Sequence, residues 1–228
     1  MSKIYLEQVF EIRFKPQSKF LDKRGEIAGA VTDPFLNQWS ITENTINFKS
    51  DTKKYVGGFF SFKNLGFSGS YPTNNDDFSS FTKNFIKKSW SYIPLADVIR
   101  IGLKTKMVTP VSSFNEYFDK FRDKFIALNK NELDNFGGTL VDLAFPLNFA
   151  DGLNQFNTLS GPVKKAEIIS SFKTAESEAP ENGIFCEVDY FTTEIRSFLK
   201  QKDVLDFVDA GIEKANKVSD EVLLILDK

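Results

Sequence analysis

The strongest constraint on the fold is a strict alternation of apolar and polar residues close to the start of the chain. The apolar side of residues 3–14 consists of Leu6, Phe10, Ile12 and Phe14. The polar side consists of Tyr5, Glu7, Glu11 and Arg13. A period of two is typical of a β-strand with one buried face. The same pattern predicts a second such strand at 97–108, where apolar residues alternate with Arg100, Gly102, Lys104 and Lys106.

The remaining segments indicate an α+β protein in which one order of elements occurs twice. After the strand at 3–14 we expect a helix at 18–31, strands at 37–42, 45–50, 54–62 and 65–71, and a helix from Asp76 or Asp77 to 92. After the strand at 97–108 we expect a helix at 113–128, strands at 137–149, 153–159, 163–173 and 183–192, a helix at 193–215, and a short helix or turn at 219–226.

This order predicts two similar β-α-β(3-4)-α halves, residues 1–94 and 95–228, packed as one unit. Strings of this kind form curved antiparallel sheets with helices on one face. The order of elements is similar to that of a TATA-binding-protein half or, more loosely, a helix-grip domain. Such a likeness concerns architecture and carries no function.

Histidine is absent from the 228 residues, and this excludes more chemistry than any other feature. Catalysis by Ser-His-Asp or Cys-His groups and zinc hydrolysis of the HExxH type all need that side chain. Cys186 is the single cysteine, so neither an intramolecular disulfide nor a multi-cysteine zinc site is expected. Because the glycines of residues 57–69 match no phosphate-binding motif, no cofactor is expected either.

Charge and hydropathy point to a cytoplasmic protein. The 29 basic and 31 acidic residues nearly cancel, so no overall field would attract nucleic acid. Phe59, Phe60, Phe62 and Phe67 are faintly similar to an RNA-stacking sheet, but 25 Phe residues occur throughout the chain, and nucleic acid is not the expected partner. The sequence contains no secretory signal pattern and no apolar run long enough to span a membrane.

Three strand-like segments stand in order along the chain: VFEIRF at Val9–Phe14, DVIRIGLK at Asp97–Lys104 and CEVDYF at Cys186–Phe191. Together they resemble a sporadically distributed family of uncharacterised bacterial and archaeal proteins of about this length. That family tends to read Arg-Ile-Gly-Leu-Arg-Tyr and then Asn in the second segment, whereas this chain has Lys104-Thr105-Lys106 there. The resemblance implies no catalytic residues, and it implies a place in mobile defence or toxin-neutralising loci.

Four basic residues are the candidate binding site: Arg13, Arg100, Lys104 and Lys106. The last three share one face of the strand at 97–108, and Gly102 between them leaves room for a backbone or a ligand. This arrangement would suit a phosphate or carboxylate. The alternative is that the cations form cross-strand pairs with the polar face of the strand at 3–14.

Three carboxylates form an alternative, metal-binding candidate. Glu187 and Asp189 share one face of the expected strand at 183–192, and Asp142 lies within an apolar run. Three converging carboxylates can bind Mg²⁺ for hydrolysis. An exposed sheet face would give the same alternation without any metal.

The sequence favours a non-enzymatic binding protein whose working surface is a curved sheet. The expected partner is another protein, which includes a second copy of the chain. Two alternatives stay open: a metal-dependent hydrolase or nuclease that uses the three carboxylates, and a Phe-lined cavity for an apolar small molecule between a helix and the sheet.

Overall fold

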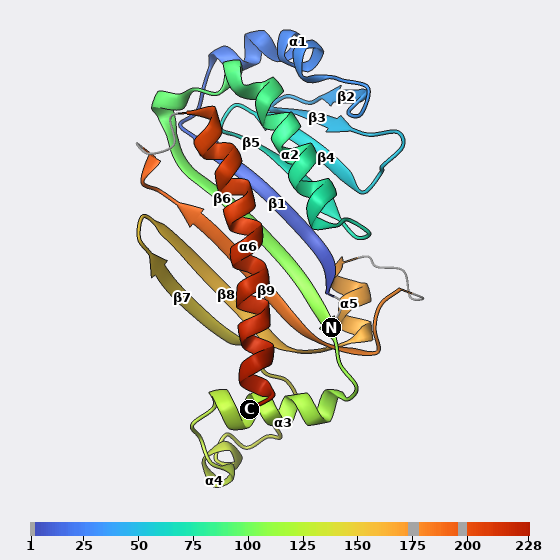
Figure 1. Ribbon diagram of the computed structural model, residues 1–228, viewed down its shortest axis with the longest axis vertical. Helices are drawn as coiled ribbons and strands as arrows, with labels where there is room; N and C mark the ends of the chain where they lie inside the picture. Colours follow the sequence, from blue (N-terminus) through green and yellow to red (C-terminus); the bar gives the residue numbers. More distant parts are fainter. Residues whose placement is uncertain (1–2, 173–177, 196–199) are drawn as a thin grey trace.

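The protein is an α+β structure built on one open antiparallel sheet of nine strands, in the order β2-β3-β4-β5-β1-β6-β9-β8-β7 (Figure 1). A computed structural model describes residues 3–172, 178–195 and 200–228. The strands are β1 (Ile4–Phe14), β2 (Gln38–Ile41), β3 (Thr45–Lys49), β4 (Val56–Ser61), β5 (Asn64–Ser70), β6 (Val98–Pro110), β7 (Phe145–Asp151), β8 (Asn154–Lys164) and β9 (Asn182–Thr192). The helices are α1 (Lys19–Val31), α2 (Asn75–Ser89), α3 (Phe114–Phe125), α4 (Lys130–Asp134), α5 (Lys165–Phe172) and α6 (Gln201–Leu226), with 3-10 turns at Trp90–Tyr92 and Leu95–Asp97.

The two strands with the clearest alternation, β1 and β6, are neighbours at the centre of the sheet. They pair antiparallel from Ile4↔Val108 to Phe14↔Val98, with a bulge after Tyr5. Their apolar faces are buried from Gln8 to Phe14 of β1 and from Ile101 to Thr109 of β6, whereas Ile99 at the start of β6 is 50% exposed. Tyr5 was expected on the polar face, but before the bulge it points to the helix-covered side, where its hydroxyl donates to Asn216 Oδ1 at 2.7 Å. The pairing joins β2–β5 to β7–β9, so the segments on either side of residue 94 share a single sheet.

Helices α1, α2 and α6 cover the apolar face of the sheet through one large core. Phenylalanine rings fill much of it, because Phe10, Phe67, Phe78 and Phe85 are each no more than 1% exposed. Gly211 lies where α6 crosses the sheet, and a Cβ there would be 3.1 Å from the Cβ of Leu103. The glycine therefore lets the longest helix lie close to the central strands.

Several expected boundaries are wrong, and local contacts explain them. Helix α2 is capped by Asn74, whose side chain accepts a hydrogen bond from the N–H of Asp77. Helix α6 runs without a break through Ser219, which is 3% exposed, so no separate terminal helix begins there. Its expected start at 193 is also wrong, since α6 begins at Gln201, and residues 196–199 lie outside the described part.

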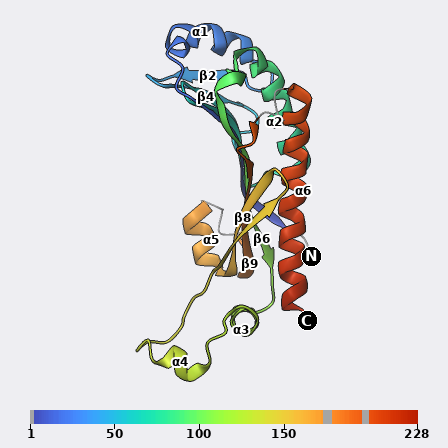
Figure 2. The same ribbon diagram turned by 90° about the vertical axis from the view of Figure 1, so that its left-hand side faces the viewer.

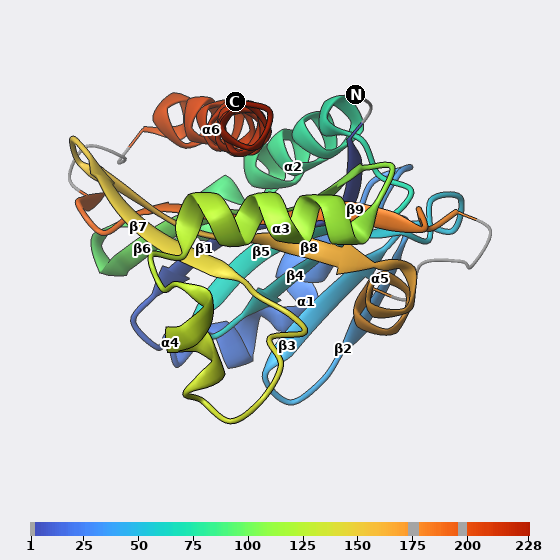
Figure 3. The same cartoon turned by 90° about the horizontal axis from the view of Figure 1, so that it is seen from below.

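The second segment departs most from the expected order. The expected strand at 137–149 begins only at β7 (Phe145–Asp151), after the short helix α4. The expected strand at 163–173 is instead the end of β8 followed by α5, with residue 173 outside the described part. Helix α5 lies on the opposite side of the sheet from α2 and α6 (Figures 2 and 3), so the expectation of helices on one face is wrong for it. The described residues give no evidence of two similar halves.

None of the helices in the described part of the chain has an apolar stretch long enough to cross a bilayer.

Candidate functional site

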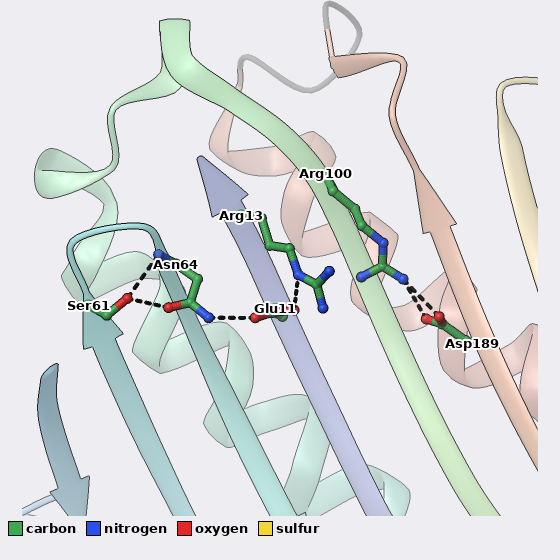
Figure 4. A network of polar contacts seen from close by, with 6 residues as sticks. All are labelled: Glu11, Arg13, Ser61, Asn64, Arg100 and Asp189. Carbon is green, nitrogen blue, oxygen red and sulfur yellow. Dashed lines mark hydrogen bonds and ion pairs between the residues drawn. The ribbon is translucent and has the colours of Figure 1, made fainter. Parts of the chain in front are cut away.

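The polar face of the central strands carries a ladder of ion pairs across β1, β6 and β9. Lys104 Nζ lies 3.0 Å from Glu187 Oε1, and Lys106 Nζ lies 2.6 Å from Glu7 Oε2. Arg100 donates from Nη2 to both carboxylate oxygens of Asp189, at 2.7 and 2.9 Å (Figure 4). Each cation that the sequence suggested on β6 therefore contacts a carboxylate of this chain.

Arg13 lies directly across the strand pair from Arg100, and its charge is also matched. Its Nε donates to Glu11 Oε2 at 2.6 Å, and Glu11 Oε1 accepts from Asn64 Nδ2 at 2.6 Å (Figure 4). The Ser61 hydroxyl in turn donates a hydrogen bond to Asn64 Oδ1. The four cations of this face are balanced by Glu7, Glu11, Glu187 and Asp189, which leaves no excess charge to attract an anion.

Gly102 leaves space above the strand because it has no side chain, as the sequence indicated. The guanidinium of Arg100 occupies this space. A Cβ at Gly102 would lie 2.6 Å from Arg100 Nη1. The guanidinium lies across this position, 4.6 Å from the ring centroid of Phe191 on β9. Arg100 thus bridges two strands through an ion pair and a cation–π contact.

The structure does not bring the three candidate metal ligands together. Asp142 lies exposed in the connection before β7, where its carboxylate accepts a hydrogen bond from the N–H of Leu143 at 2.7 Å. Glu187 and Asp189 contact Lys104 and Arg100, as described above. Across residues 3–172, 178–195 and 200–228, no group of three or more Asp, Glu, His or Cys side chains could hold a metal ion.

A different site lies on the helix-covered face, where α6 and the β7–β8 hairpin enclose an apolar cavity of about 360 Å³. One wall is α6, the opposite wall is the hairpin, and α3 closes the end near the C-terminus. In Figure 1, α3 lies beyond the last turns of α6, with β7 and β8 alongside the helix. The lining residues are Phe121 and Phe125 of α3, Phe145, Leu147 and Phe149 of β7, Phe156, Thr158 and Ser160 of β8, and Lys214, Lys217, Val218, Glu221, Val222 and Ile225 of α6.

The cavity wall is built from rings that hold one another in place. Phe149 and Phe156 are paired across the hairpin and stack with centroids 4.6 Å apart. Phe125 stacks on Phe145 at 4.7 Å and contacts Phe121 at 5.2 Å. Ring pairs of this kind stabilise a structure by about 0.5–1.5 kcal/mol beyond the area that they bury, so they help to fix the shape of the wall.

The floor of the cavity is buried, and its mouth is open. Phe121 is fully buried, and the hydroxyl residues Thr158 and Ser160 are 7% and 5% exposed. The Thr158 hydroxyl donates to the Leu147 carbonyl, and the Ser160 hydroxyl donates to the Cys186 sulfur, each at 3.5 Å. Phe149, at 43% exposure, lies at the mouth, and charged groups come only from one side of α6. A concave, mainly apolar site of this volume suits a small molecule.

The alternation of Phe145, Leu147 and Phe149 was visible in the sequence, but it was not singled out. It showed which side chains share a face of β7. It could not show that α6, which begins about 50 residues later at Gln201, stands far enough from that face to leave a cavity.

In comparisons with known proteins, no protein-family model and no curated protein matches this chain. The family resemblance drawn from three short segments therefore stays a prediction.

Proposed function

We propose that this protein binds a small apolar molecule in the cavity between α6, α3 and the β7–β8 hairpin. The observation that carries the proposal is the ring-lined space of about 360 Å³, which reaches a buried floor beside Phe121. Burial of an apolar ligand there stabilises the complex by about 0.8 kcal/mol for each CH₂ removed from water.

A series of straight-chain alcohols tests this proposal by isothermal titration calorimetry. Each added methylene is expected to tighten binding by about fourfold until the cavity is full, and then the gain should stop. Equal, weak binding of short and long alcohols would contradict an enclosed apolar site.

Two matched variants of α6 test whether the alcohols bind in the cavity. Val222 lines the cavity, so Val222→Trp should fill it and abolish binding of the longer alcohols. Leu224 is half exposed on the same helix and does not line the cavity, so Leu224→Trp should leave binding unchanged. If both variants bind like the original protein, the ligand sits elsewhere and the proposal fails.

A protein partner is the second candidate, and the edge strand β2 is the observation that favours it. All four residues of β2 are exposed, and Trp39 and Ile41 are 49% and 38% exposed. An uncovered edge strand offers free backbone groups to a strand of another protein.

A pull-down of the tagged protein tests this second candidate. Trp39→Ser combined with Ile41→Ser should release any partner bound at β2, whereas Leu21→Ser, at a 43% exposed position on α1, should not. If the double variant still pulls down the partner, the partner binds at another surface.

A further inference from the structure

The charges at the mouth of the cavity all come from one side of α6. Lys214, Lys217 and Glu221 are spaced by three and four residues, so they follow one line along the helix. Val218, Val222 and Ile225 form the adjacent apolar line that faces the cavity. A ligand in the cavity would thus place its tail against the valines and its head group beside the charged line.

Lys214 already has an ion-pair partner and a ring contact within the protein. Its Nζ lies 2.6 Å from Asp151 Oδ2 at the end of β7, and 4.8 Å from the ring centroid of Phe156. The ion pair fixes the hairpin turn against α6 and neutralises both charges.

Lys217 is exposed and makes no ion pair within the described part of the chain, so its ammonium group is unmatched at the mouth. It lines the cavity one turn after Lys214 on α6. The hydrogen bond and charge of Lys214, and then the charge of Lys217, lower the pKa of Asp151 at the hairpin turn. Glu221 lies about 6 Å farther along the helix axis, at four residues and 1.5 Å each, toward α3. The hairpin end of the mouth is therefore the positive end.

We infer that the ligand is an amphiphile with a carboxylate head beside Lys217 and an apolar tail that runs along α6 toward Phe121. This inference rests on the proposed function. The volume sets the size of the tail. Since benzene fills an engineered cavity of about 150 Å³, a cavity of about 360 Å³ holds an apolar body of roughly ten to fourteen carbons.

Three ligands with the same tail test the head group: decanoate, decanol and decylamine, each titrated into the full-length protein by calorimetry. Decanoate is expected to bind more tightly than decanol by up to about fivefold, the upper end of the range for an exposed ion pair. Decylamine is expected to bind more weakly than decanol. High salt should remove the difference between decanoate and decanol and leave decanol binding in place.

A matched pair of lysine variants assigns the preference to one residue. Lys217→Gln should make decanoate and decanol bind equally, whereas Lys87→Gln, at an exposed position on α2 far from the cavity, should keep the preference. An equal effect of both variants would mean that net charge alone is responsible, and would overturn the inference.

The outcomes separate this inference from the proposed function. If decanol binds as tightly as decanoate, or if decylamine binds most tightly because of Glu221, the carboxylate assignment is wrong while the apolar site stands. If none of the three ligands binds, the proposed function itself is wrong.

Discussion

Replacing Gly102 by alanine should destabilise the protein by displacing the side chain of Arg100. The new Cβ would lie 2.6 Å from Arg100 Nη1, so the guanidinium has to move away from Asp189 and Phe191. Charged hydrogen bonds of this kind stabilise a fold by about 1.5–3 kcal/mol, and a partly exposed cation–π contact adds about 0.5 kcal/mol. Since the Arg100 side chain is 17% exposed, we take the lower part of this range, about 2 kcal/mol in all.

Alanine in a strand is itself about 0.5–1 kcal/mol better than glycine, because less backbone entropy is lost on folding. The net cost of Gly102→Ala should therefore be about 1 kcal/mol. In a protein that already carries Arg100→Ala, the clash is gone, and the same substitution should stabilise by about 0.5 kcal/mol.

Urea unfolding of the original protein, the two single variants and the double variant measures this coupling. The expected result is a change of sign between the two backgrounds. If Gly102→Ala has the same effect in both backgrounds, within about 0.5 kcal/mol, Arg100 does not occupy the space above the glycine.

Three other outcomes follow from the burial and hydrogen bonding of single side chains. Phe121→Ala should lower the free energy of unfolding, measured in urea, by about 3 kcal/mol, because its ring is fully buried in the core below the cavity. A decrease of less than about 1 kcal/mol would contradict that packing. Burial raises the pKa of Cys186 to about 11, so thiol reagents at mildly alkaline pH should label it only after unfolding, and native labelling as fast as that of denatured protein would refute this. The pKa of Asp33 is lowered: burial alone would raise it, but hydrogen bonds from the N–H groups of Leu36 and Phe35, at 2.6 and 2.8 Å, outweigh burial. A carboxyl whose pKa is lower in the folded state stabilises the fold above its unfolded pKa, and this contribution is lost as the pH falls through the folded pKa. Asp33→Ala should therefore cost about 1–2 kcal/mol at neutral pH and less in acid, whereas a cost independent of pH would exclude this role.

Local patterns predicted the centre of the sheet well and the helix ends less well. The alternation in β1 and β6 requires one buried face, and the structure has it from Gln8 to Phe14 and from Ile101 to Thr109, but not at Tyr5 or Ile99. Ser113 caps α3 as expected, with its hydroxyl accepting from the N–H of Glu116. Ser219 was expected to cap a second helix. A serine can also lie within a helix when that helix packs against the rest of the protein. Here α6 continues because Ala215, Ser219 and Leu226 all lie buried against the rest of the protein.

The candidate site could not be derived from the sequence, because its decisive contacts join distant segments. The register that places Lys104 beside β9 spans more than 80 residues, and no local pattern fixes it. The sequence predicts a polar, cationic face on the strand at 97–108, and the structure has it, but Glu187 and Asp189, which the sequence suggested as metal ligands, are the carboxylates that pair with these cations. The cavity depends on the distance between α6 and the hairpin, and its lining residues come from separate segments of the chain in α3, the β7–β8 hairpin and α6.

The most direct test of the account is a titration of the protein with decanol, followed by the NMR signals of its leucine, valine and isoleucine methyl groups. We expect saturable shifts at Leu147, Val218, Val222 and Ile225, which line the cavity, and no change at Leu65 in the distant core. If the four cavity residues do not shift up to the solubility limit of decanol, or if the shifts appear only in the distant core, the cavity is not the binding site.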